Sequence, residues 1–248
     1  MRISYAKPES AYGIRICLTR GMKRGRKPTI DAADITRAAI AIADAEGLGA
    51  VSMARVAQEM GNATMALYRH VKSKDELLTL MADAAFDEPP LLPDGEWRDK
   101  LGVWAKEMLK GIRRRPWFLQ IPMSGPPTGL KSLAWFDSAL GALEGTPLEA
   151  GEKVGVVMGL MTFVHGEAWL SVTLQQGFDD DPAQFTRQYG QRLREIVDPR
   201  RMPALAKIIA AGVFDVEDLF DADDVAADFD FGLHLFLEGI AAHIGSRT

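Results

Sequence analysis

The chain has 248 residues, 47% of them hydrophobic, which is enough apolar material for one large or two smaller domains. Cys17 is its only cysteine, so an intramolecular disulfide framework and a cysteine-based zinc site are excluded, and we expect a reducing, cytoplasmic location. The net charge of −5 argues mildly against a nucleic-acid partner until it is divided by region.

No membrane segment or secretion signal is expected. The longest uninterrupted apolar run, residues 154–164, falls well short of the roughly 20 residues that cross a bilayer. Residues 1–30 lack the apolar core of a signal peptide, and Met22 is an alternative start.

Charge is distributed unevenly along the chain. Residues 1–74 hold 13 Lys or Arg and 6 Asp or Glu, whereas residues 75–248 hold 16 basic and 28 acidic residues. The N-terminal end is therefore suited to an anionic partner.

The elements predicted in chain order are all helical, because β-branched alternation is nearly absent. A first helix covers 34–46, behind a cap at Asp31 or Asp34. A second begins at the capping residue Ser52, and a third covers 64–70, opened by Thr64. A fourth starts with a capping box, Ser73 to Glu76, and runs toward residue 86.

A proline-rich break at 89–93 predicts the domain boundary. We expect a disordered basic arm at 1–27, a helix-turn-helix DNA-binding domain at 28–88, and a larger helical ligand-binding and dimerisation domain at 95–248. The helices predicted in this last part cover 96–114, 117–121, 130–143, 148–175, 182–195, 202–211 and 223–244.

Two short helices joined by a tight turn at Gly61 predict a helix-turn-helix, whose second helix enters the major groove. Cations that can meet phosphates surround this unit: Lys23, Arg24, Arg26, Lys27, Arg55, Arg69, His70, Lys72 and Lys74. The alternative is an ordinary helical bundle with a basic, solvated face.

The run ITRAAIAIADAEGLGAVSMARVAQEMGNATMALYRHVKSKDELL resembles the DNA-binding domain of the tetracycline-repressor (TetR) family, without a gap from Ile35 to about Phe86. The segment 228–244 resembles the last helix of the subgroup nearest the tetracycline repressors themselves.

The resemblance implies DNA contacts at individual positions. Tyr68 and His70 match a Tyr-x-His motif that contacts phosphate or base, and Tyr68 could alternatively be the edge of the core. Lys74 matches a backbone-binding lysine. Ser52 matches a hydroxyl residue that caps the second helix and meets a phosphate. Thr64, Met65 and Arg69 match positions that lie at or near the bases. Ala54 departs from the arginine of the member that binds tetracycline operators, so we expect a different operator.

The resemblance also implies an apolar effector cavity and a homodimer, formed by a four-helix bundle of residues 148–175 and 223–244. Histidines that hold magnesium–tetracycline in the family are absent between Val71 and Val164, so that ligand is not expected. We expect no cofactor and no metal, since His234 and His243 lie nine residues apart.

Aromatic and sulfur-containing side chains of the C-terminal part are candidates to line a drug-sized pocket, although most such residues simply pack a core. The candidates are Trp104, Met108, Trp117, Phe118, Trp135, Met158, Met161, Phe163, His165 and Trp169. His165 could supply one polar contact to a ligand or be hydrogen-bonded within the core.

Glycines at 155, 159 and 166 weaken a long predicted helix by about 1 kcal/mol each. Their cost is offset either by close approach of a symmetry-related helix or by relief of crowding near the pocket.

These observations predict a ligand-responsive transcriptional repressor that binds a near-palindromic operator as a homodimer and is released by a small hydrophobic effector. The alternatives are an activator or effector-independent regulator and, from another class, a small-molecule enzyme that uses the C-terminal cavity. His165 and Glu167 form the only acid–base pair, and residues two apart on a helix point in different directions. We therefore do not expect an enzyme.

Overall fold

The computed structural model describes residues 30–122, 126–177, 182–215 and 222–247. The predicted basic arm at 1–27 lies outside these ranges, as do Pro28 and Thr29. The described ranges contain helices and no strand, which agrees with the all-α prediction.

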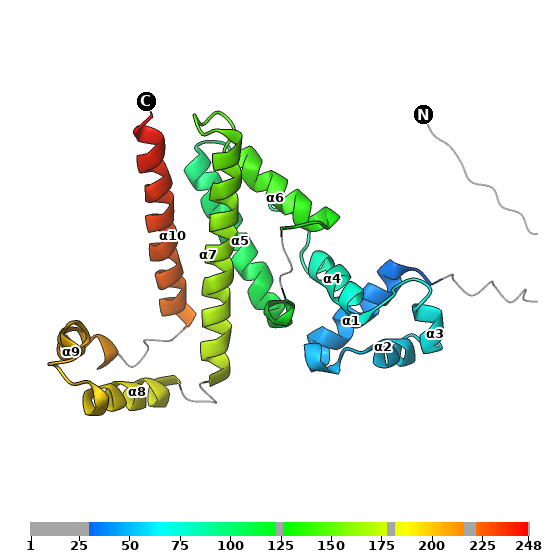
Figure 1. Cartoon of the computed structure of the whole chain (residues 1–248), viewed down its shortest axis with the longest axis horizontal. Helices are drawn as coiled ribbons and strands as arrows, with labels where there is room; N and C mark the ends of the chain where they lie inside the picture. Colours follow the sequence, from blue (N-terminus) through cyan, green and yellow to red (C-terminus); the bar gives the residue numbers. More distant parts are fainter. Residues whose placement is uncertain (1–29, 123–125, 178–181, 216–221, 248) are drawn as a thin grey trace, which may run out of the picture. The chain divides into compact units, whose positions relative to one another are not determined.

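The first group of helices is the predicted DNA-binding unit (Figure 1). It consists of α1 (Ala32–Glu46), the 3₁₀ turn η1 (Leu48–Ala50), α2 (Met53–Glu59), α3 (Thr64–Leu67) and α4 (Lys74–Ala84). Its apolar side chains meet in a small core in which Ile35, Val56, Leu67, Val71 and Leu77 are fully buried. The three-helix arrangement required for a helix-turn-helix is thus present.

The caps of these helices agree only partly with the prediction. Asp31 caps α1, and Asp34 completes a reciprocal capping box. Ser73 caps α4, but the Glu76 carboxylate accepts from the N–H of Lys72 rather than from that of Ser73, so the predicted box is shifted by one residue.

The recognition helix is shorter than predicted. It ends at Leu67 instead of residue 70, and its N-cap is Ala63, which makes no side-chain cap, so Thr64 is the first helical residue. The backbone N–H groups of Tyr68 and Val71 still donate to the carbonyls of Thr64 and Leu67, four residues earlier, so the turn after Leu67 keeps Leu67 and Val71 in the same core.

The second group contains the larger C-terminal helices. They are α5 (Trp97–Arg114), η2 (Pro116–Gln120), α6 (Leu130–Ala142), α7 (Ala150–Gly177), α8 (Pro182–Ile196), α9 (Pro203–Ala210), η3 (Val213–Asp215) and α10 (Ala222–Gly245). The core is formed by α5, α6, α7 and α10, with Trp104, Ile112, Leu143 and Leu160 among its fully buried side chains.

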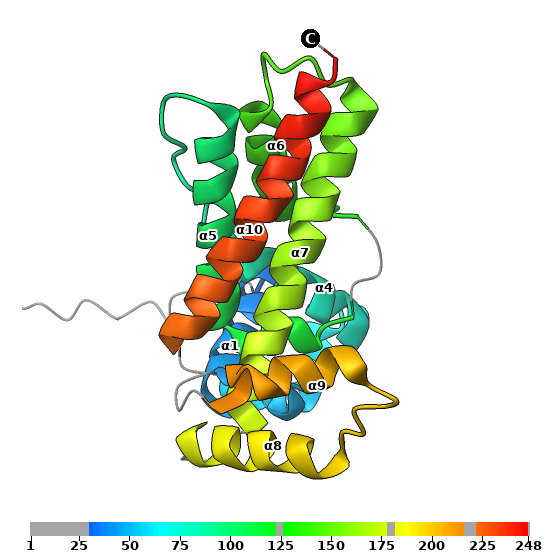
Figure 2. The ribbon, with the colours of Figure 1, turned by 90° about the vertical axis from the view of Figure 1, so that its left-hand side faces the viewer.

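Two glycine–phenylalanine contacts bring α7 and α10 together, and the two helices lie side by side in Figure 2. The ring of Phe236 lies 3.2 Å from the position that a Cβ of Gly159 would occupy, and the ring of Phe163 lies 2.9 Å from the equivalent position at Gly232. Gly159 therefore serves packing within one subunit. No atom lies within 4 Å of the equivalent positions at Gly155 and Gly166.

Helix α7 combines a long apolar sequence with limited burial inside the subunit. By length and mean hydropathy, residues 150–174 could cross a membrane, although only 28% of the most apolar window is buried inside the subunit. The 11-residue run considered in the sequence underestimated this stretch, because it stops at His165, whereas the apolar composition continues beyond His165 and Glu167. One such helix is weak evidence for a membrane segment.

Candidate DNA-binding surface and ligand cavity

The side chains of α3 and the residues after it divide between core and surface. Met65 is 73% exposed and Tyr68 is 42% exposed, and Arg69 and His70 are exposed as well. Thr64 is half-buried at the first turn. Tyr68 is therefore a surface residue rather than part of the core, and these side chains are accessible to a partner.

The starts of α2 and α4 carry the next predicted contacts. Ser52 is exposed, and its Oγ accepts a hydrogen bond of 3.1 Å from the N–H of Arg55, so it caps α2 as the sequence predicts. Its hydroxyl proton is free to be donated. Lys74 is the exposed first residue of α4, and Lys72 is exposed two residues before it.

Arg55 differs from the other predicted DNA contacts. Its guanidinium is paired with two carboxylates, Glu59 at 2.6 Å and Glu46 at 2.7 Å. The Glu46 pair links α2 to the end of α1, and the Glu59 pair lies within α2. The geometry therefore gives Arg55 a role within the domain, and contact with a phosphate would require breaking these pairs.

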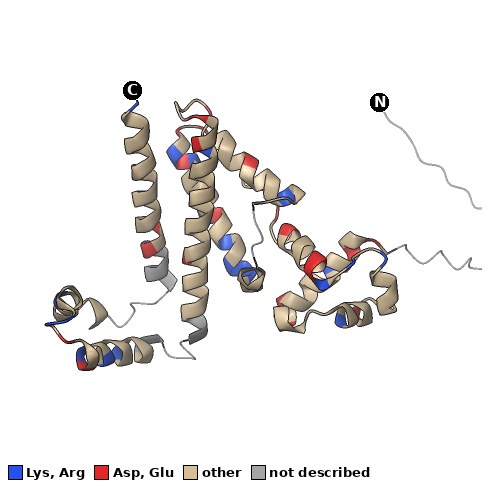
Figure 3. Cartoon of the chain, in the orientation of Figure 1, with Lys and Arg blue, Asp and Glu red and all other residues tan. Residues whose placement is uncertain are grey.

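The positive charge of the N-terminal end comes from outside the described residues. Residues 1–29 contain eight basic residues and one acidic residue, whereas residues 30–74 contain five of each. Figure 3 shows the mixed charges of the helical part. The cations Lys23, Arg24, Arg26 and Lys27 therefore account for half of the basic residues in this N-terminal excess.

A cavity of about 330 Å³ lies between α4, η2 and α7. Four of its lining residues are among the predicted candidates: Phe118, Met158, Met161 and His165. The last three lie on one face of α7, at positions separated by three and four residues. The volume is within the range of small-molecule sites.

Three predicted tryptophans do not line the cavity, because the polar end of each is held by another part of the protein. The indole N–H of Trp104 donates to the carbonyl of Trp135 at 2.9 Å, and that of Trp135 donates to the carbonyl of Asp87 at 2.9 Å. Trp117 donates to the Asp44 carboxylate at 2.6 Å. Buried tryptophans need such partners, so these rings are part of the core and of its contacts with the first helix group.

Met108, Phe163 and Trp169 also lie away from the cavity. Met108 is buried in the core of the C-terminal helices. Phe163 stacks between Phe229 and Phe236 of α10, with ring centroids 5.4 and 6.1 Å away. Trp169 is 57% exposed on α7. The apolar composition that suggested all ten candidates is shared by core and pocket, so composition alone could not separate them.

The other lining residues were missed by the sequence prediction. They come from α4, from both sides of residues 123–125 and from α7, and comprise Thr79, Ala82, Ile121, Pro122, Pro126, Pro127, Thr128 and Thr162. The sequence gives no signal that these prolines line a pocket, and it predicts α4 only as part of the DNA-binding domain. A cavity wall formed by α4 means that a ligand would contact the helix that directly follows the recognition element.

The start of α6 is fastened to α4 by one carboxylate. Asp83 accepts hydrogen bonds from the backbone N–H of Ser132 at 2.9 Å and from its hydroxyl at 2.7 Å. Gly129, the N-cap of α6, makes no side-chain cap, so Asp83 supplies the missing cap from another helix. A Cβ at Gly129 would lie 2.1 Å from the Asp83 carboxyl group, which explains why glycine is required there.

A second link joins α1 to η2. Asp44 accepts from the indole of Trp117 and lies 3.4 Å from the Arg115 guanidinium, which also donates to the carbonyl of Ala85. Residues that line the cavity, Phe118 and Pro127 among them, thus lie within a few residues of both links between the two helix groups.

His165 and Glu167 do not form an acid–base pair. Nδ1 of His165 is hydrogen-bonded to the carbonyl of Met161 at 3.0 Å. Burial raises the pKa of Glu167, as does the charge of Asp228, whereas Arg113 lowers it. Within the described ranges, no group of three or more His, Cys, Asp or Glu residues lies close enough to hold a metal ion.

Two family models together cover most of the chain. The tetracyclin repressor-like C-terminal domain matches residues 89–244, and the model of bacterial regulatory proteins of the tetR family matches residues 35–81. The chain belongs to the TetR family. The second match coincides with the helix-turn-helix group, and the first with the helices that surround the cavity.

Individual TetR relatives match over nearly the whole length. The HTH-type transcriptional repressor DrrR1 of Streptomyces coeruleorubidus is 34% identical over 238 residues, which cover 92% of this chain and 83% of DrrR1. An HTH-type transcriptional regulator of Saccharopolyspora erythraea is 26% identical over 223 residues, 88% of each chain.

Solved structures share the fold. ActR of Streptomyces coelicolor, determined in complex with actinorhodin, superposes with a TM-score of 0.74 at 24% identity, over 90% of this chain and 100% of ActR. This TetR regulator therefore has the family's architecture in both helix groups.

Proposed function

We propose that this TetR-family protein is a transcriptional repressor that binds a near-palindromic operator as a homodimer and releases it when a small apolar effector enters the cavity between α4 and α7. The observation that carries the proposal is that Thr79 and Ala82 of α4 form part of the cavity wall. An effector that prefers one position of α4 changes how the DNA-binding helices are presented.

The relatives support the repressor and effector assignments. DrrR1 is named as a repressor, and ActR has been solved with actinorhodin bound. By analogy, we propose an organic effector of similar general kind for this chain, without transferring either identity.

The proposed dimer uses the outward faces of α7 and α10. Val154, Trp169 and Leu170 of α7 are 43–57% exposed, and Phe231 and Leu235 of α10 are 65% and 55% exposed. Figure 3 shows few charges along the middle of both helices. A contiguous apolar surface of this kind favours a protein partner, and Gly155 and Gly166, with open space at their Cβ positions, would allow a second copy of α7 to approach closely.

For DNA binding, we propose that Thr64, Met65, Tyr68, Arg69 and His70 face the major groove and its flanking phosphates. Ser52, Lys72 and Lys74 contact the backbone, together with the arm at 23–27. Arg55 is left out of this set because Glu46 and Glu59 already bind it. Two recognition helices of a dimer would read half-sites about 34–36 Å apart.

The proposal is tested by selecting an operator from a random duplex library with the full-length protein, and then titrating that operator with wild type and with the Arg69→Ala/Lys74→Ala variant. We expect the double variant to weaken binding at least tenfold and to reduce the salt dependence by about two phosphate contacts per subunit, or about four for the proposed dimer. A control variant, Lys110→Ala, removes a cation on α5 that pairs with Glu107 and should bind as wild type does. Unchanged affinity in the double variant would contradict the assigned DNA surface.

Effector response is measured on the same operator. A panel of uncharged aromatic compounds is expected to include at least one that lowers operator affinity in wild type and loses this effect in Met161→Trp, which fills the cavity. Operator affinity that no compound alters would favour the effector-independent alternative.

A further inference from the structure

His165 combines a place on the cavity wall with an unused polar atom. It lies on α7 beside Met158 and Met161, and its ring centroid is 5.5 Å from that of Phe118. Nε2 has less than 1 Å² of exposed surface and no hydrogen-bond partner among the described residues. A buried polar atom without a partner is costly, so such an atom in a cavity wall is a candidate for ligand contact.

The other ring nitrogen fixes the chemistry of Nε2. Nδ1 lies 3.0 Å from the carbonyl oxygen of Met161, and a carbonyl can only accept, so Nδ1 carries a proton. Burial lowers the pKa of His165, an effect that the hydrogen bond to Met161 partly offsets. The ring is therefore neutral at pH 7, and Nε2 is a hydrogen-bond acceptor.

Two of the three threonines of the same wall also offer acceptors. The hydroxyl of Thr162 donates to the carbonyl of Met158 at 2.9 Å, and that of Thr79 donates to the carbonyl of Asp75 at 2.9 Å. Both hydroxyl protons are engaged, which leaves only oxygen lone pairs on these two residues. The described residues that line the cavity include no charged side chain. A matching ligand is therefore uncharged and carries a hydrogen-bond donor.

We infer that the effector is an uncharged aromatic molecule that carries a hydroxyl group, and that this hydroxyl donates a hydrogen bond to Nε2 of His165. The inference depends on the proposed function in one respect, which is that this cavity is the effector site. The aromatic part follows from the apolar wall, in which Phe118, Met158 and Met161 surround the imidazole. Side chains that cover Nε2 must move slightly as the hydroxyl arrives, a rearrangement common at binding sites.

The inference is tested with a pair of probes that differ only in the donor, 2-naphthol and 2-methoxynaphthalene. Binding of each to the full-length protein, without DNA, is measured by calorimetry and by naphthol fluorescence. We expect wild type to bind 2-naphthol about tenfold more tightly than the ether, as for one hydrogen bond to a buried acceptor. In His165→Phe, which keeps an aromatic ring against Phe118, the preference should disappear. His165→Leu provides a second variant if the first does not fold.

Thr146→Val is the matched control, because it also removes a hydroxyl whose proton is engaged by a backbone carbonyl, but it lies outside the cavity wall. It should keep the preference for 2-naphthol. Equal affinity of wild type for both probes, or a preference that is kept in His165→Phe, would overturn the contact. Failure of both probes to bind would overturn the aromatic ligand class as well.

The outcome is separable from that of the proposed function. A protein that binds 2-naphthol through His165 but does not change its operator affinity would contradict effector-induced release and leave the contact with His165 intact.

Discussion

At the scale of single residues, the hydrogen-bond partner of each indole N–H shows which tryptophans belong to the core rather than to the cavity wall. Trp104, Trp117 and Trp135 each donate to a fixed oxygen of the protein, and those oxygens belong to α6, to α1 and to the residues after α4. Through these bonds the rings connect the helix groups and fill the core, and the cavity is lined by other side chains, His165 among them.

His165 predicts a specific acid response of stability. Its pKa is lowered by burial from the ordinary 6.5, so the folded state resists protonation while the unfolded chain takes up a proton near pH 6.5. The stability contribution of the neutral ring is present above pH 6.5 and is lost as pH falls from there through the folded-state pKa. His165→Gln, which does not titrate, should therefore lose less unfolding free energy than wild type between pH 7.5 and 5.5.

The comparison uses urea denaturation at fixed protein concentration, since a dimer's stability depends on concentration. Carboxylates titrate alike in both proteins and cancel in the difference. Parallel decreases in wild type and variant would contradict a neutral, buried imidazole.

At the scale of elements, α6 depends on a cap from another helix. The Asp83 carboxylate binds Ser132 and occupies the space where a Cβ of Gly129 would lie. We predict that Asp83→Ala destabilises the protein by about 1 kcal/mol, the usual cost of a lost cap. Gly129→Ala should destabilise wild type by a similar amount or more, because the added methyl displaces the same carboxylate.

In the Asp83→Ala background, Gly129→Ala should be within about 0.5 kcal/mol of neutral, because the clash partner is gone. Denaturation of the four proteins gives this coupling energy. Gly141→Ala is the control: it lies in the same helix with no atom within 4 Å of its Cβ position, and should be neutral or slightly stabilising. Additive effects of the two substitutions would mean that Asp83 does not cap α6.

The elements also show where sequence-based reasoning succeeded. Helical periodicity and stop signals predicted α1, α5, α7 and α10 to within a few residues, since these helices are long and are bounded by stop signals. The short α3 was overestimated because Val71 stays buried on the face that a longer helix would present, so the apolar pattern does not reveal the early end. Asp83 carried no local signal, since its partner Ser132 is 49 residues away.

Parts of the candidate site could likewise be predicted from the sequence, and other parts could not. The exposed residues of α3 followed from the helix-turn-helix pattern, whereas the cavity depends on α4 meeting η2 and α7. Three cavity residues of α7 were among the candidates chosen by residue type, and Thr79 and Ala82 were not, because the proline break suggested that α4 belonged to one domain alone.

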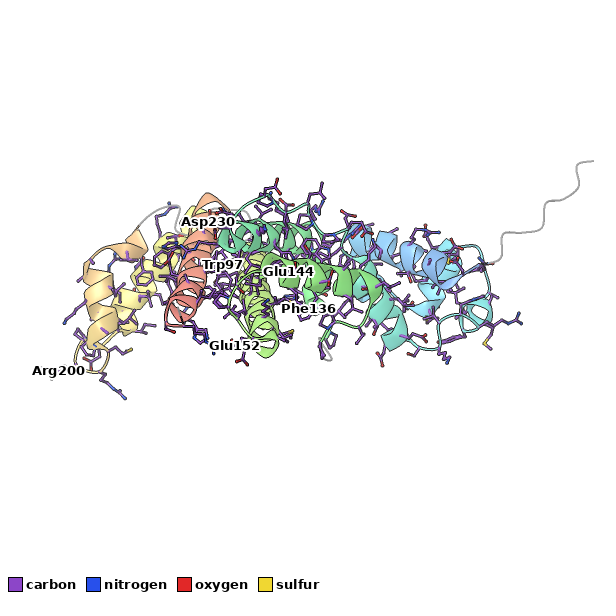
Figure 4. All side chains as sticks on the ribbon, turned by 90° about the horizontal axis from the view of Figure 1, so that it is seen from above. Trp97, Phe136, Glu144, Glu152, Arg200 and Asp230 are labelled. Atoms are coloured by element: carbon purple, nitrogen blue, oxygen red, sulfur yellow. The ribbon has the colours of Figure 1, made fainter. Side chains whose placement is uncertain are left out.

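At the scale of the whole molecule, the ends of α7 and α10 are held by charges while their middle faces are apolar. Glu152, labelled in Figure 4, lies 3.1 Å from His243 and 2.7 Å from Arg247, and Asp230 pairs with Lys106 of α5. These contacts fix the two helices within one subunit and leave Phe231 and Leu235 available for a partner.

We predict that Phe231→Asp/Leu235→Glu converts the proposed dimer to a monomer in size-exclusion chromatography with light scattering, because two charges per subunit would be buried without partners. Leu91→Glu, at a side chain that is 98% exposed in a loop, should leave the mass unchanged. A double variant that stays dimeric would place the dimer contact on another surface.

The charge distribution of the whole chain leads to a prediction for the arm. Replacing Lys23, Arg24, Arg26 and Lys27 by Gln should weaken operator binding and reduce the slope of log K against log salt by up to about 0.9 per lost phosphate contact. Anisotropy titrations between 50 and 200 mM salt, roughly the range over which this effect is large, measure the slope. As a control, replacing Arg192, Arg194, Arg200 and Arg201 by Gln removes the same charge from the C-terminal half, and this variant should show the same slope as wild type. Equal slopes in wild type and in the arm variant would contradict a role of the arm in DNA binding.

The wall that α4 contributes to the cavity makes operator DNA itself an antagonist of the effector. Thermodynamic linkage requires that, if the effector weakens operator binding by some factor, the operator weakens effector binding by the same factor. In the proposed repressor, a dimer already seated on its operator therefore needs a higher effector concentration than a free dimer does. The response threshold in a cell would depend on how many operator copies hold the protein, as well as on the affinity of the cavity.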